Sequence, residues 1–146
     1  MGQVTRIDFY ILEIAGAEAR ERFACRLAEK AYDAGHRAFI LTEDEAQTER
    51  LDTLLWTFRQ GSFVPHATSA ERDGEPVAIG SESPAPDDEV LINIRDTEPK
   101  EWRRWPRVAE IVDQREPVLQ ASRRRFRGYR DAGVTPHTHR IEARQR

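Results

Sequence analysis

The sequence predicts a single α/β domain whose central sheet is mostly parallel and flanked by helices, with a nucleotide-binding-like topology that lacks a phosphate loop. Two observations support this class. Short apolar runs rich in β-branched and aromatic residues alternate with amphipathic helical patterns, and a chain of 146 residues has the usual size of one domain. The first strand-to-helix connection, EIAGAEAR, has one glycine and no lysine, so the motif that cradles phosphates is missing.

The first strand and the first helix are expected at the N-terminus. Arg6–Leu12 (RIDFYIL) is a short apolar run typical of a buried strand. Ala17–Ala34 is expected to be a helix because apolar residues recur at every fourth position from Phe23. Gly35 follows where helices often end in the left-handed conformation.

A second strand and helix follow directly. Arg37–Leu41 (RAFIL) is expected to be a strand. Thr42 and Glu45 have the spacing of a capping box, so we expect a helix to begin there and to run through three leucines to Trp56.

The C-terminal half is expected to contain further strands and one long helix. Residues 67–86 hold prolines and glycines typical of a loop, and the elements expected in and after it are strands at Val77–Ile79, Glu89–Arg95 and Arg107–Val112, a turn or short helix at Pro99–Pro106, and a helix at Pro117–Ala132.

The last helix is bracketed by a proline in its first turn and by Gly133 after its end. The domain is therefore expected to span residues 1–133, followed by a polar, irregular tail over residues 134–146.

Composition and charge limit the classes of function. No apolar run is long enough to cross a membrane, and a single cysteine, Cys25, fits a reducing compartment, so we expect a cytoplasmic protein. Residues 1–102 carry 11 basic and 21 acidic side chains, whereas residues 103–146 carry 12 arginines and 5 acids. An arginine-rich end on an acidic body indicates an anionic partner, either nucleic acid or an acidic peptide.

The segment after the second helix is the first candidate for a binding site. It presents Trp56, Phe63, Val64, Pro65 and His66 close together in the sequence. Large aromatic residues around a proline turn are typical of a protein–protein hot spot. The alternative is structural: Phe63–His66 forms a short edge strand, and Trp56 belongs to the core.

The last helix is the second candidate. Arg123, Arg127 and Arg130 form one stripe at helical spacing. Beside an apolar groove between helix and sheet, such a stripe would suit a peptide with acidic residues and a terminal carboxylate. The alternative is a solvated face near a helix C-terminus, where cations are favoured anyway.

No set of residues indicates catalysis, a metal or a cofactor. His137 and His139 lack a third ligand nearby, and no nucleophile accompanies His66. Two further hypotheses stay open: an enzyme with an unrecognised phosphate site, and a single-stranded-DNA binder that stacks bases on Trp102 and Trp105.

The chain resembles the chi subunit of bacterial DNA polymerase III over nearly its whole length. The resemblance rests on these motifs: Glu43-Asp44, Leu51-Asp52-x-x-Leu55-Trp56, Ser62-Phe63-Val64-Pro65-His66, the early Phe9-Tyr10, and the closing Phe126-Arg127-Gly128-Tyr129-Arg130-x-Ala132-Gly133.

The resemblance implies a non-catalytic accessory subunit of an assembly with DNA polymerase activity, which contacts DNA only indirectly. It implies a psi-type subunit of the clamp loader as one partner, bound through the segment of Trp56 and Phe63. The other implied partner is the acidic C-terminal tail of single-stranded-DNA-binding protein. Arg123 matches the family's tail-binding arginine, Phe126 an aromatic of the same site, and Leu119 a position that is basic in some chi proteins. Either Arg127 or Arg124 then supplies the missing charge, or the tail binds more weakly than in those proteins.

Overall fold

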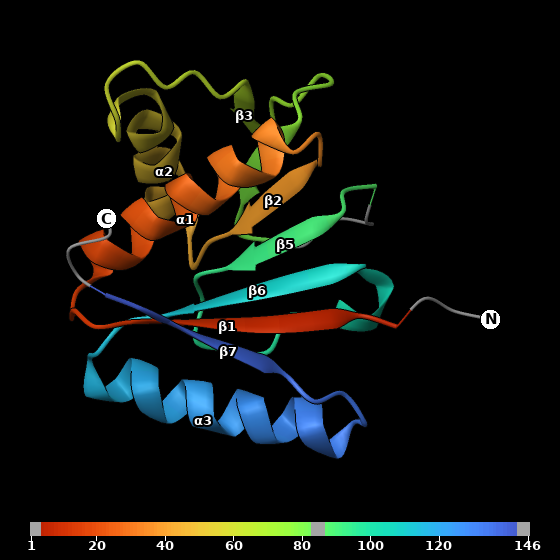
Figure 1. The fold of residues 1–146 in the computed structure, drawn as a ribbon. Helices are drawn as coiled ribbons and strands as arrows, with labels where there is room; N and C mark the ends of the chain where they lie inside the picture. The colour runs from red at the N-terminus through yellow and green to blue at the C-terminus, as the bar shows by residue number, and fades with distance from the viewer. Residues whose placement is uncertain (1–3, 83–86, 143–146) are drawn as a thin grey trace.

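Seven parallel strands form one sheet with helices on both faces in the computed structural model, which describes residues 4–82 and 87–142 (Figure 1). The strand order is β3-β4-β2-β5-β6-β1-β7. This arrangement confirms the expected α/β class. The elements are β1 (Arg6–Leu12), α1 (Ala17–Asp33), β2 (Ala38–Leu41), α2 (Glu45–Thr57), β3 (His66–Thr68), β4 (Val77–Gly80), β5 (Val90–Asn93), the 3-10 helix η1 (Trp102–Arg104), β6 (Arg107–Val112), α3 (Glu116–Asp131) and β7 (His137–Ile141).

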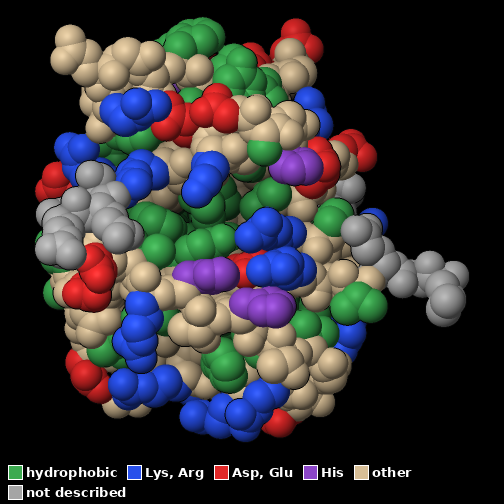
Figure 2. All heavy atoms as spheres, viewed as in Figure 1, with side chains coloured by type: hydrophobic (Ala, Val, Ile, Leu, Met, Phe, Trp, Pro, Cys, Tyr) green, Lys and Arg blue, Asp and Glu red, His purple; other side chains and the backbone are tan. Residues whose placement is uncertain are grey.

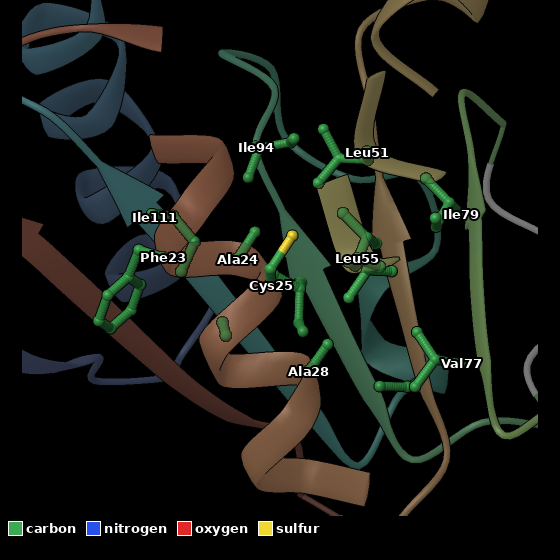
Figure 3. Close-up of a cluster of buried hydrophobic side chains, with 14 of the residues drawn as sticks. Phe23, Ala24, Cys25, Ala28, Leu51, Leu55, Val77, Ile79, Ile94 and Ile111 are labelled. Carbon is green, nitrogen blue, oxygen red and sulfur yellow. The ribbon is translucent and has the colours of Figure 1, made fainter. Parts of the chain in front are cut away.

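The sheet has a hydrophobic core on each face. In β2, Ala38 and Ile40 belong to one core and Phe39 and Leu41 to the other, because successive side chains of a strand point to opposite faces. The first core lies under α1 and α2 (Figure 3), and the second lies under α3 and η1. With both faces covered, the central strands read as continuous apolar runs.

The start of α2 differs from the expected capping box. Asp44, not Thr42, is the N-cap residue, and its carboxylate accepts a hydrogen bond of 2.8 Å from the Gln47 amide. The Gln47 side chain in turn accepts from the Glu43 amide at 2.8 Å. Asp44 and Gln47, which make these two hydrogen bonds, lie two positions after the expected Thr42 and Glu45. The Thr42 hydroxyl is instead directed to the Thr48 hydroxyl, 2.6 Å away.

The structure expected for the segment after α3 is wrong. The tail was expected to be irregular, yet His137–Ile141 forms β7, which pairs in parallel with β1 at the edge of the sheet. Backbone hydrogen bonds to β1 hold this polar segment in the strand, so the segment needs no apolar alternation of its own. The last residues of the expected tail, 143–146, lie outside the described residues.

One further strand lies in the expected loop. His66–Thr68 forms β3, an edge strand that pairs with β4, and Pro65 directly precedes it. Pro65 thus lies where a missing N–H costs no ladder bond. No helix in the part of the chain that the structure describes is long and apolar enough to cross a membrane.

Candidate protein-binding surfaces

Trp56 and Phe63 form an exposed aromatic pair, here called the aromatic surface. Their side chains are 54% and 65% exposed, and their ring centroids lie 5.9 Å apart. Trp56 is exposed because Leu51 and Leu55 occupy the core-facing side of α2, and the next residue turns about 100° away from the core. Among the described residues, the only other large hydrophobic side chain this exposed is Val4.

The residues beside this pair are buried and hold the loop in place. Val64 lies in the core under α2, and His66 is buried against Trp56, with 4.5 Å between the ring centroids. The two His66 ring nitrogens lie 2.7 Å from the Val64 carbonyl and 2.9 Å from the Asp52 carbonyl. Pro65, between them, is half-buried.

A carboxylate on α1 fixes the other end of the same loop. Glu29 forms an ion pair of 2.7 Å with Arg59 and accepts a short hydrogen bond from the Ser62 hydroxyl. Burial acts to raise the pKa of Glu29, but these two hydrogen bonds and the arginine charge outweigh burial and leave that pKa below its usual value. The aromatic pair therefore combines Trp56 of α2 with Phe63 of a loop that is anchored at both ends.

A second exposed surface runs along α3 and is called the arginine surface. Arg123, Arg127 and Arg130 are all exposed, as the spacing predicted. The Arg123 side chain is 59% exposed, and its Nη1 lies 3.9 Å from the Glu116 carboxylate in the same helix. This weak contact leaves the guanidinium accessible to a partner.

Partly buried apolar side chains lie along the same stripe of α3. Leu119, Arg123, Phe126 and Arg130 recur at spacings of four, three and four residues, so they share one face of the helix. Leu119 and Phe126 pack against the second core but keep part of their surface open. The Arg130 guanidinium lies over the Phe126 ring at 6.0 Å from its centroid.

The edge strand β7 adds a cation that sequence reasoning missed. Arg140 pairs in register with Ile11 and is exposed. Because Ile141 packs against the first core, strand alternation places Arg140 on the α3 face of the sheet. Only the pairing of β7 with β1 brings Arg140 there, so no local pattern could have indicated it.

One arginine of the last helix is buried rather than part of the stripe. Arg125 is 4% exposed, and its guanidinium contacts Glu110 of β6 at 3.1 Å. The sequence contained one signal for this pairing, because an acid within the apolar strand RVAEIV needs a buried partner.

The position where nucleotide-binding domains hold a phosphate is occupied by a carboxylate. The Gly16 amide at the start of α1 donates to Asp113 at 3.2 Å, and Asp113 also pairs with Arg115 at 2.7 Å. Arg20 of the first turn is buried and binds the Ile111 carbonyl and Asp96. An acidic group at this helix terminus opposes the binding of a phosphate.

Trp102 of η1 and Trp105 directly after it cannot stack the bases of single-stranded DNA. Trp102 and Trp105 are 6% and 1% exposed, respectively, and both belong to the second core. That part of the DNA-binding hypothesis is wrong, because the apolar rings fill the space under η1 and α3.

Comparison with known proteins assigns the chain to a family. The family model for the DNA polymerase III chi subunit, HolC, matches residues 4–137. The chain is 40% identical to DNA polymerase III subunit chi of Pseudomonas aeruginosa over 139 residues, which cover 94% of this chain and 98% of that protein. It is 32% identical to the protein of the same name from Escherichia coli over 138 residues, covering 89% of this chain and 94% of that protein.

Proposed function

The chain belongs to the family of DNA polymerase III chi subunits, accessory subunits in replication, and we propose that it connects two protein partners. One partner is a psi-type subunit of the clamp loader, bound by the aromatic surface. The other is the acidic C-terminal tail of single-stranded-DNA-binding protein, bound by the arginine surface. Through these two surfaces the chain contacts DNA only indirectly, in the cytoplasm, and the chain itself is not catalytic.

The observation that carries the tail assignment is the stripe on α3 in which the exposed Arg123 and Arg130 flank the half-buried Phe126. A peptide that ends in an aromatic residue and a carboxylate needs an apolar contact beside a cation. Phe126 and Leu119 offer the apolar contact, while Arg123 offers a planar guanidinium for the carboxylate. Arg130 in the stripe, Arg127 beside it on α3 and Arg140 on the same face of the sheet add positive charge for the acidic residues upstream.

The psi assignment rests on the aromatic pair. Trp56 and Phe63 are exposed and adjacent, and both are presented by anchored segments. Preorganised aromatic side chains are the usual centres of binding energy in interfaces. Val64, Pro65 and His66 support this site from beneath.

The two surfaces lie on opposite faces of the sheet, since α2 covers one face and α3 the other (Figure 1). Partners bound at the two sites would therefore not compete for space. This placement suits a subunit that holds two proteins at the same time.

The test compares intact single-stranded-DNA-binding protein with the same protein lacking its acidic tail. We expect the chain to bind the intact protein and to lose that binding when the tail is removed. Binding should also weaken as salt rises, because exposed charges are screened over a Debye length of about 10 Å at 0.1 M salt. Equal binding to both forms would contradict the tail assignment.

A further inference from the structure

A buried carboxylate on β1 gathers basic side chains from its own strand and from both neighbouring strands. Asp8 has no exposed side-chain surface, and it contacts Arg6 at 3.0 Å, Arg107 at 3.0 Å and His139 at 2.7 Å. Arg6 and Arg107 are register partners on β1 and β6, while His139 comes from β7. One negative charge thus orients two guanidinium groups and one imidazole.

These three basic side chains remain partly exposed to solvent. The side chains of Arg6, Arg107 and His139 are 49%, 42% and 38% exposed, respectively. Asp8 uses the Nε of both arginines, and Arg107 donates from Nη2 to the Tyr10 hydroxyl. Neither arginine Nη1 hydrogen-bonds to any residue within 4–82 or 87–142.

A hollow of about 910 Å³ adjoins this cluster on the α1 face of the sheet. Its size is within the range of small-molecule sites. Figure 2 shows arginine and histidine side chains gathered over β1, β6 and β7 beside an apolar depression. Tyr10 and Arg107 belong to both the cluster and the hollow, and Tyr10 stacks on His139 at 4.8 Å between centroids, with the rings 18° from parallel.

Arg26 of α1 also lines the hollow. Arg26 Nη1 is buried and has no hydrogen-bond partner among the described residues. Over the whole lining, four arginine or lysine side chains face two carboxylates, one of which, Glu29, is already paired with Arg59. The hollow therefore has an excess of positive charge over an otherwise acidic protein.

We propose that Arg6, Arg107 and His139 form a phosphate site, and that the planar ring of the same nucleotide unit lies in the hollow against Tyr10. The unit is either a free nucleotide or part of a single strand. A phosphate fits better than a single carboxylate, because one buried acid leaves an excess of guanidinium charge and two unused Nη1 donors. The Tyr10 ring lines the hollow together with Phe23 and offers an aromatic contact for a base.

The cations of the proposed phosphate site belong to neither protein-binding surface, although the hollow beside them shares Glu29 and Arg59 with the anchor of the loop that carries Phe63. The arginine surface lies on the opposite face of the sheet, and the aromatic surface lies beyond α1 on α2 (Figure 1). Loss of binding to either protein partner would leave this site unaffected.

Amide NMR titration of the full chain tests the proposal with four probes: inorganic phosphate, thymidine, thymidine monophosphate and oligothymidylate. We expect the monophosphate to shift Arg6, Tyr10, Arg107 and His139, and to bind more tightly than phosphate or thymidine alone. Tighter binding of oligothymidylate per nucleotide identifies a strand as the source, and tighter binding of the monophosphate identifies a free nucleotide.

Variants assign the effect to the cluster. Arg107→Gln should weaken monophosphate binding about tenfold, the usual effect of losing a hydrogen bond to a charged group. Arg104→Gln is the matched control, because the Arg104 side chain is 54% exposed and pairs with a single glutamate, Glu101, directly before η1. If Arg107→Gln does not fold, the amide chemical-shift changes of the wild-type protein decide the outcome on their own. The proposal is overturned by absent shifts, by shifts confined to other elements, by an unchanged affinity in folded Arg107→Gln, or by shifts at the cluster with an acidic peptide only.

Discussion

Tyr129 of α3 donates a 2.6 Å hydrogen bond to the Glu110 carboxylate of β6, inside the second core. Glu110 also accepts from Asn93 at 2.9 Å and from Arg125 at 3.1 Å. Burial, and then the charge of Glu110, raises the pKa of Tyr129 well above its usual value, so the phenol stays a donor. This network joins β5, β6 and α3 and sets the rotation of α3, which decides where Arg123 points.

Removal of the Tyr129 hydroxyl group should lower the free energy of unfolding measurably. Tyr129→Phe leaves one Glu110 oxygen without its donor, which should cost about 1–2 kcal/mol in the free energy of unfolding. Urea unfolding followed by circular dichroism measures the change. Tyr32→Phe is the control, because Tyr32 is only partly buried and should change stability by less than about 0.5 kcal/mol. Equal stabilities of the two variants would show that the network contributes nothing.

The Asp8 cluster should make the fold sensitive to acid. Burial acts to raise the pKa of Asp8, but hydrogen bonds from Arg6 and His139 and the charge of Arg107 outweigh it and leave that pKa below 3.8. A carboxyl whose pKa is lower in the folded state stabilises the fold at pH values above its unfolded pKa, about 3.9. That contribution is lost as the pH falls from about 4 through the folded value.

Asp8→Asn tests this directly. At pH 7 the variant should be less stable by about 1–3 kcal/mol, because two arginines lose the negative charge that they share. The difference between the variant and the wild type should shrink below pH 4, where the wild-type carboxyl becomes protonated. A difference that stays constant from pH 7 to pH 3 would contradict the assignment.

Cys25 should be unreactive in the folded protein. The thiol is fully buried in the first core (Figure 3), and burial raises its pKa to about 12. Little thiolate therefore exists at neutral pH. A thiol reagent such as Ellman's reagent should react with Cys25 only after denaturation. Rapid reaction of the native protein would show that α1 opens readily.

Phe63→Ala should weaken the psi-type partner without unfolding the chain. Because Phe63 is 65% exposed, its removal should leave the free energy of unfolding within about 0.5 kcal/mol. A hot-spot aromatic typically contributes about 2 kcal/mol or more to binding. Pull-down with the clamp-loader assembly measures the loss, with Val4→Ala as a still more exposed apolar control. Unchanged capture would remove Phe63 from the interface, and unfolding would mean that its role is structural.

Much of the fold could be predicted because its strongest signals are local. The strand Arg6–Leu12 and the helix Ala17–Asp33 lie where apolar pattern and terminal glycine placed them. Gly35 indeed has a φ of +83°, and the Ala31 carbonyl accepts the following amide. These features depend on a few adjacent residues.

The errors concern contacts between distant segments. The strand β7 exists because β1 offers an open edge, which its own polar sequence does not reveal. Arg125 is buried because Glu110 lies across from it on another element. The site residues show the same division: Trp56 and Phe63 are exposed as a binding role requires, whereas the burial of Val64 and His66 follows from the packing of a loop between α2 and β3.

The most direct test of the central claim is calorimetric titration of the acidic tail peptide into wild type, Arg123→Ala, Arg123→Lys and Arg22→Ala. Arg22 is the matched control, because it is an exposed helical arginine paired with a glutamate of its own helix, on the opposite face of the sheet. We expect Arg123→Ala to lose about 2 kcal/mol of binding free energy. Arg123→Lys should also bind more weakly, since lysine lacks the planar fork. Arg22→Ala should match the wild type. Equal affinities of wild type and both Arg123 variants would contradict the account and leave α3 without its proposed role.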